Sequence, residues 1–428
     1  MDTGMISWYA AIIGLLLAIF LILRRFNPLY SLFLGAIVGC LFGGVSLVDT
    51  VDILIKGTQS IMGTAIRVLA AGMLAGVMME SGAAESIANA IVNKLGANKI
   101  LLALALSTMI ITAVGVFIPV AVLIVAPIAL SVGKQTGMSK LALLTALSGG
   151  GKAGNIISPN PNTIAATEGF KLTLSDVMIG GFIPALFGLL ATVIIANMIK
   201  HKGVTVADKD VKGNKKEFMP LKKALITPLL SVVLLLLNPL GNLLNMAILQ
   251  NIKIDAMYIL PFASVVGAIA MGHAGNISAY ATSGVRRVTD TVLILIGAGA
   301  IAGLISASDL STQVVHVIMS LGLSGVFLAP LSGVIMGLAV GSTSTAVILA
   351  TGSFGDAILS TGLNPLSAAV MVHTGSTVID AVPQGNYFHV SADSMKMTIK
   401  ERLQIIPYEV CIGGVMTLVA VVLYGFQK

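Results

Sequence analysis

The chain has 428 residues, of which 56% are hydrophobic and only 10% charged, and its mean hydropathy is +0.99. A soluble protein of this size carries far more charge, so the composition predicts an all-α protein that crosses the membrane several times. The net charge of +7 fits the Lys and Arg excess of cytoplasmic loops, and it does not indicate a nucleic-acid partner.

Apolar segments begin close to the N-terminus. The segment 8–23 is followed by Arg24 and Arg25, which predicts a retained first helix with a cytoplasmic end rather than a cleaved signal. The first part of the chain, 1–199, contains further apolar segments at 27–46, 67–80, 100–114, 118–132, 139–150 and 176–199.

The stretch 200–223 is the only long hydrophilic one, and eight of its residues are lysines. It is typical of a cytoplasmic linker, which we expect to be a solvated loop; a site for lipid head groups is the alternative. The second part of the chain, 224–428, contains apolar segments at 224–240, 254–272, 290–307, 323–340, 345–359, 365–379 and 405–425.

The two parts resemble each other in sequence. "GMLAGVMMESG" from Gly72 resembles "GAIAGLISASD" from Gly299, and "TGMSKLALLTALSGG" from Thr136 resembles "TGLNPLSAAVMVHTG" from Thr361. Several such matches in one order indicate an internal duplication, with membrane repeats at 1–199 and 224–428. Repeats in a membrane protein favour a secondary transporter, and the repeats are inverted if each spans the membrane an odd number of times.

Each repeat contains a helix interrupted by helix-breaking residues. In the broken helix predicted over 139–170, "SPNPNT" from Ser158 stops the helix, and Thr163 is predicted to cap its continuation. In the broken helix predicted over 365–392, Pro383 and Gly385 stop the helix. Non-helical backbone at membrane depth must be buried in protein or face water, so paired breaks predict a binding site.

A turn inside an apolar run precedes each break and predicts re-entrant hairpins over 100–133 and 323–360. The second tip, Ser342–Thr345, has four hydroxyls where a half-helix begins, which favours a carboxylate; the first tip, Phe117–Pro119, is apolar. Alternatively, these hydroxyls bond to their own helices or join helices. The candidate substrate-binding residues are Ser158, Asn160, Asn162, Thr163, Ser342, Thr343, Ser344, Thr345, Thr374, Ser376, Gln384 and Asn386.

Three ionisable residues lie in the broken helices. Lys152 attracts a substrate carboxylate, pairs with an acid, or snorkels to the membrane interface. Asp380 and His373 are seven residues apart, so we expect them on one helix face as candidate proton carriers, with Asp380 first and structural hydrogen bonds as the alternative. No spacing of metal ligands, ATP-binding motif or hydrolase motif is present, so no metal, cofactor or enzymatic activity is predicted.

The segment "GSTSTAVILATG", the paired broken helices and "SGAAESIANAIVNKLG" resemble the gluconate:proton symporter (gluconate permease) family of the ion transporter superfamily. The resemblance implies import of sugar acids or related hydroxy acids with protons across the cytoplasmic membrane. It also implies a homodimer with a scaffold and an elevator-type transport domain.

The chain departs from the family's better-known members, which have a His- and Pro-rich loop at Ser158–Asn162. Gluconate, glycerate and an amino acid such as serine therefore all remain candidate substrates. Na⁺ coupling is the alternative to protons, and a cation:proton antiporter is a more distant one because the breaks are mostly amides and hydroxyls. A channel is disfavoured because the two breaks differ in chemistry.

Overall fold

The computed structural model describes residues 5–96, 99–211, 218–251, 254–310, 312–313, 316, 325–383 and 385–425, and its regular elements are helices. The first part contains α1 (Trp8–Leu23), α2 (Pro28–Phe42), α3 (Leu47–Ser60), α4 (Met62–Glu80), α5 (Ala83–Leu95), α6 (Ile100–Ala113), α7 (Ile118–Thr136), α8 (Lys140–Ile156), α9 (Pro161–Gly169), α10 (Leu174–Gly180) and α11 (Phe182–Met198). The second contains α12 (Leu221–Ala224), α13 (Ile226–Leu243), α14 (Ala247–Gln250), α15 (Ala256–Ala270), α16 (Ile277–Ser306), α18 (Leu328–Val340), α19 (Thr343–Ser360), α20 (Pro365–Ser376), α21 (Asn386–Ser394), α22 (Ile399–Leu403) and α23 (Ile406–Tyr424).

The predicted all-α fold is confirmed. Within the described residues, five helices are long and apolar enough to cross a membrane, or six if α10 and α11, bent by 43°, form one span. Large apolar side chains on α11 are exposed, which suits a surface that faces lipid. They include Phe182, Leu186, Phe187, Leu190 and Ile194.

The sequence analysis missed some helical residues. α3 and α5 were not predicted because each mixes charged and apolar residues, so neither is a continuous apolar run. α16 begins 13 residues before the predicted start at 290, and its polar first part includes Arg287, which pairs with Glu80 of α4 at 3.1 Å.

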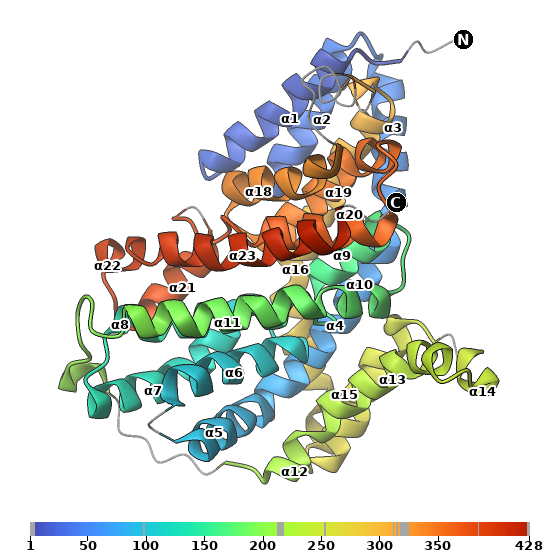
Figure 1. Cartoon of the computed structure of the whole chain (residues 1–428). Helices are drawn as coiled ribbons and strands as arrows, with labels where there is room; N and C mark the ends of the chain where they lie inside the picture. The colour runs from blue at the N-terminus through green and yellow to red at the C-terminus, as the bar shows by residue number, and fades with distance from the viewer. Residues whose placement is uncertain are drawn as a thin grey trace.

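One group of helices, α1–α4 with α13, α15 and α16, packs around the long inclined pair α4 and α16 (Figure 1). Glycines allow the backbones of this pair to touch. A Cβ on Gly76 would lie 2.3 Å from the carbonyl oxygen of Tyr280, and one on Gly284 would lie 2.0 Å from that of Gly72. Such contacts let α4 and α16 pack closely along their length.

A second group contains α5–α11 and α18–α23, and within it α8, α11 and α23 lie side by side (Figure 1). Four of its helix pairs start 225 residues apart: α7 and α19 at 118 and 343, α8 and α20 at 140 and 365, α9 and α21 at 161 and 386, and α10 and α22 at 174 and 399. A duplicated segment gives this regularity.

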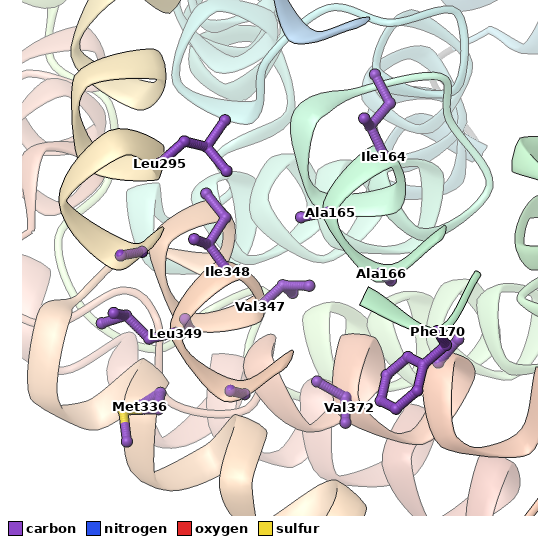
Figure 2. Packing of buried hydrophobic residues seen from close by; sticks show 14 of the residues in the cluster. Ile164, Ala165, Ala166, Phe170, Leu295, Met336, Val347, Ile348, Leu349 and Val372 are labelled. Carbon is purple, nitrogen blue, oxygen red and sulfur yellow. The ribbon is translucent and has the colours of Figure 1, made fainter. Parts of the chain in front are cut away.

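α19 joins the two groups. Its side chains Val347 and Ile348 lie between Ile164 and Ala165 of α9 on one side and Leu295 of α16 on the other (Figure 2). α19 therefore packs at once on the continuation of the first broken helix and on the long helix α16. This position places the first turn of α19 beside both breaks.

The first part of the linker that follows α11, residues 200–211, is hydrogen-bonded to the start of α8. Asp210, in the short 3-10 turn Asp208–Asp210, is buried and pairs with Lys140 at the start of α8 at 2.9 Å. The Lys140 ammonium also donates to the carbonyl of Lys396 at 2.7 Å. Most residues of 200–211 are exposed, as in a solvated loop, while Val206 and Asp210 are buried and Lys140 provides a buried partner for Asp210.

Candidate functional site

The first break comprises the four residues between α8 and α9, and Asn160 holds its two sides together. Its Oδ1 accepts from the backbone N–H of Asn162 (2.9 Å) and of Thr163 (3.1 Å), so Asn160 is the N-cap of α9. Its Nδ2 donates to the backbone carbonyl of Asn155 at 2.7 Å. The prediction that Thr163 is the cap is wrong because Pro161 occupies the first helical position, which makes residue 160 the cap.

The second break is longer and begins earlier than predicted. α20 ends at Ser376 and α21 begins at Asn386, so Asp380 lies in the non-helical segment between them. The expectation that Asp380 and His373 share a helix face is therefore wrong. Asp380 is held instead by partners from two other helices, which the local sequence does not reveal.

An ion pair connects the two broken helices. The ammonium of Lys152, on α8, lies 2.5 Å from Oδ1 of Asp380 and donates to the carbonyl of Thr377, also at 2.5 Å. The hydroxyl of Thr343, at the start of α19, donates to Oδ2 of Asp380 at 2.5 Å. Lys152 is fully buried and Asp380 is 4% exposed, so the pair is closed to solvent.

The tip of the second hairpin touches both breaks. Ser344 donates a hydrogen bond to Oδ1 of Asn162 in the first turn of α9, directly after the first break. At the second break the contact is between backbones, since a Cβ on Gly385 would lie 2.0 Å from the carbonyl oxygen of Gly341. Gly341 ends α18 with φ of +65°, which a residue with a side chain rarely adopts.

The other residues of this tip cap their own helix. Ser342 is the N-cap of α19, and its Oγ accepts from the N–H of Thr345 at 3.5 Å and from the Thr345 hydroxyl at 3.3 Å. The first hairpin has a different tip, where Gly115, with φ of +106°, lies against Leu74 and Pro159. The chemical difference between the tips agrees with the sequence, and it leaves Thr343 and Ser344 as the hydroxyls that reach across.

Several predicted site residues have other surroundings. Thr374 and Ser376 donate to carbonyls of their own helix, at 2.9 Å to Val370 and 2.8 Å to Val372. Asn386 is exposed at the start of α21, and Gln384 lies outside the described residues. The side chains of Thr374, Ser376 and Asn386 are thus not part of the contacts that join the breaks.

Two predicted residues are buried without a hydrogen-bond partner among the described residues. One is Ser158, in the first break. The other is His373 on α20, where neither ring nitrogen has a partner. Buried polar groups usually have partners, so these two stand out.

A second buried ion pair near the broken helices was missed by the sequence analysis. Arg402 of α22 makes two hydrogen bonds to Glu409 of α23, at 2.9 and 3.0 Å, and donates to Ser391 at 2.7 Å. Glu409 also accepts from Ser148, one helical turn before Lys152 on α8, at 2.5 Å. Two opposite charges seven residues apart beside an apolar segment are a weak signal, and the sequence analysis gave neither residue a role.

Each of these two ion pairs is neutral in formal charge. Lys152 and Arg402 contribute two positive charges, and Asp380 and Glu409 contribute two negative ones, all at 0–4% exposure. The formal charge of the buried set is therefore zero. An additional charge brought into this region would have no partner, which costs several kcal/mol in a medium of low dielectric constant.

Membrane-spanning helices, two broken helices and a buried polar site between them define a polytopic membrane transporter. The fold is shared with the YdaH transporter of Alcanivorax borkumensis, with a TM-score of 0.70 over 89% of this chain and 90% of that one, at 15% identity. Residues 5–426 match the model of the GntP family of permeases, so the chain belongs to this family.

Relatives within the family differ in what their names state. An uncharacterized transporter of Haemophilus influenzae is 45% identical and covers 99% of both chains. The D-serine transporter DsdX of Escherichia coli O6:H1 is 26% identical over 79% of this chain and 80% of its own. A gluconate permease of Zymomonas mobilis is 23% identical over 99% of this chain and 98% of its own. These findings agree with the family expected from the sequence, and with a transporter rather than an enzyme.

Proposed function

We propose that this permease imports a small hydroxy-carboxylate, such as gluconate or glycerate, with protons across the cytoplasmic membrane. The observation that carries this proposal is the buried Lys152–Asp380 pair between the two breaks. Lys152 provides a cation for the substrate carboxylate. Asn160, Asn162, Ser158, Thr343 and Ser344 provide hydroxyls and amides suited to the hydroxyl groups of the substrate.

The charge of the buried residues supports coupling to a cation. They are neutral as a set, so an anionic substrate adds one uncompensated negative charge unless a cation enters with it. Asp380 is the proposed proton carrier, because it is the carboxylate that contacts Lys152 and Thr343. His373 is the second candidate for this role.

An amino-acid substrate is the second candidate function, and the D-serine transporter among the relatives favours it. Na⁺ remains the alternative to protons as the coupling ion. A cation:proton antiporter fits less well, since among the described residues Asp380 is the one carboxylate at the breaks. One experiment distinguishes these possibilities: a hydroxy-carboxylate or an amino acid as substrate, Na⁺ in place of protons, and an antiporter.

The experiment is uptake of labelled gluconate, glycerate and serine into proteoliposomes that contain the purified protein. A pH gradient and a Na⁺ gradient are imposed in turn, each with protein-free liposomes as control. We expect accumulation of a hydroxy-carboxylate driven by the pH gradient. If neither gradient drives accumulation, the proposal is contradicted. If accumulation needs the Na⁺ gradient, Na⁺ is the coupling ion in place of the proton.

The proposed mechanism moves the second group of helices against the first. In this proposal 1–199 and 224–428 are inverted repeats joined by 200–223, the group around α4 and α16 is the scaffold, and the group with both breaks is the transport domain. We also propose a homodimer. Native mass spectrometry in detergent tests the dimer, and a cross-link between α16 and α19 that stops uptake would support the movement.

A further inference from the structure

We propose that Lys152 and Asp380 exchange their mutual ion pair for the charges of the substrate, so that the substrate's own charge sets the number of protons carried. A hydroxy-carboxylate would enter with one proton, and a zwitterionic amino acid with none. This inference rests on the proposed function, since it concerns the same site, and it adds a rule that connects substrate class to coupling.

The pair is built so that a substrate competes with it. Lys152 has no water-exposed surface, and two of its three N–H donors are already engaged, by Oδ1 of Asp380 and the carbonyl of Thr377. A carboxylate that approaches the Lys152 ammonium therefore competes with Asp380 for the same cation. Asp380 then retains Thr343 as its hydrogen-bond partner, and a hydroxyl does not neutralise its charge.

Among the described residues, the surrounding charges do not offer Asp380 a replacement cation. On α22, Arg402 is engaged by both oxygens of Glu409 and by Ser391. On α21, Tyr387 is neutral, and on α23, Glu409 is itself an anion held by Arg402 and Ser148. His373, on α20, is bonded to none of these groups. An unpaired Asp380 therefore has to bind a proton.

With a hydroxy-carboxylate the exchange balances as follows. The substrate carboxylate pairs with Lys152, and one proton from water on the entry side binds a carboxylate oxygen of Asp380. The enclosed charge stays zero, as before binding. On the exit side the substrate leaves Lys152, Asp380 releases the proton to water, and the ion pair forms again.

With a zwitterionic 2-amino acid the balance needs no proton. The carboxylate pairs with Lys152 and the ammonium, on the adjacent carbon, pairs with Asp380. Two ion pairs replace one, and the enclosed charge is again zero. The same two side chains can therefore accept both substrate classes found among the names of the relatives, with different coupling.

The test measures protons per substrate in proteoliposomes of the full-length protein. A pH-sensitive dye reports the lumen, the membrane voltage is clamped with K⁺ and valinomycin, Na⁺ is left out, and labelled glycerate and serine are the probes. We expect about one proton per glycerate and about zero per serine. Proton entry with serine, or glycerate entry without protons, would overturn the inference. Absence of uptake of any hydroxy or amino acid would instead contradict the proposed function.

Asp380→Asn gives an independent readout, because asparagine resembles the protonated carboxyl. Exchange of glycerate across the membrane should persist, while accumulation driven by a pH gradient is lost and serine exchange falls at least tenfold. Asp393→Asn, the same change at an exposed position on α21, is the matched control and should behave like the unmodified protein. If Asp380→Asn retains accumulation driven by the pH gradient, the inference is wrong; if it does not fold, the ratios in the unmodified protein still decide.

Discussion

Gly150 and Gly375, 225 residues apart, make the same contact in the two parts of the chain. A Cβ on Gly150 would lie 2.0 Å from the carbonyl oxygen of Ala105, and a Cβ on Gly375 would lie 2.3 Å from that of Pro330. Ala105 and Pro330 are also 225 residues apart, so each broken helix rests on the first limb of its hairpin at an equivalent point.

Alanine at either glycine should destabilise the protein. Alanine favours a helix by about 1 kcal/mol over glycine, but the clash is with backbone that cannot rotate away, and overpacking costs about 1–3 kcal/mol or more. We expect Gly150→Ala and Gly375→Ala to lower the melting temperature in detergent. Gly414→Ala is the control, since nothing lies within 4 Å of its Cβ position. Equal melting temperatures in all three variants would contradict the contact.

The hydrogen bond between Ser344 and Asn162 should be needed for uptake, and removal of either partner should have the same effect. Loss of one such bond at a binding site costs about 1–3 kcal/mol, so we expect Asn162→Ala and Ser344→Ala each to slow uptake by about 5- to 150-fold. The double variant should be little worse than either single one, because the two side chains act together. Ser360→Ala, at the far end of α19, is the control, as its hydroxyl bonds within its own helix. Uptake at normal rates in both single variants would show that the substrate binds elsewhere.

The buried pair of Arg402 and Glu409 should be costly to break from one side only. Arg402→Met leaves the Glu409 charge buried without its cation, and such changes cost about 3–5 kcal/mol. The double variant Arg402→Met, Glu409→Gln removes both charges and should recover much of the loss. Melting temperatures of the three proteins check this, and a double variant less stable than Arg402→Met would refute it.

Acid should weaken the attachment of the linker to α8. Burial tends to raise the pKa of Asp210, but hydrogen bonds from Lys140 and from the N–H of Ala207, with the charges of Lys140 and Lys209, lower it below its usual value. A carboxyl with a lowered pKa in the folded state stabilises that state above its unfolded pKa of about 4, and this contribution is lost as the pH falls further.

Asp210→Asn should therefore melt at a lower temperature than the unmodified protein at pH 7, and the difference should shrink below about pH 4. The control is Asp208→Asn, because Asp208 is mostly exposed and its pair with Lys134 contributes little. A difference that stays constant down to pH 3 would mean that the charge of Asp210 is not involved.

His373 should be dispensable for proton coupling. Neither ring nitrogen has a partner among the described residues, and the residue is fully buried on α20. Leucine fills a similar volume without unpaired polar atoms, so His373→Leu should keep the proton-to-substrate ratio and melt at the same or a higher temperature. If His373→Leu still takes up substrate but no longer carries protons with it, His373 and not Asp380 is the proton carrier.

The breaks could be located from the sequence because proline, glycine and asparagine interrupt apolar segments, and these residues act locally. Asn160 shows the limit of local reasoning: its amide was predicted to bind substrate, while its position before Pro161 also makes it the helix cap. The partners of Asp380 could not be predicted. Lys152 is 228 residues away in the chain, and their meeting depends on the packing of three helices.

Arg402 and Glu409 escaped prediction for the same reason. Charges near a helix end are usually solvated, and only the packing of α8, α21 and α23 around them reveals that both are buried. The amphipathic helices α3 and α5 were missed because a search for continuous apolar runs does not find helices with one polar face.

Thr343 and Ser344 are consecutive residues, yet one bonds to Asp380 and the other to Asn162. Side chains one residue apart on a helix point about 100° apart, so a single turn can face both breaks. Any displacement of that turn must release both contacts in one cooperative event. Solvent would then reach the two halves of the site simultaneously, and neither half would open alone.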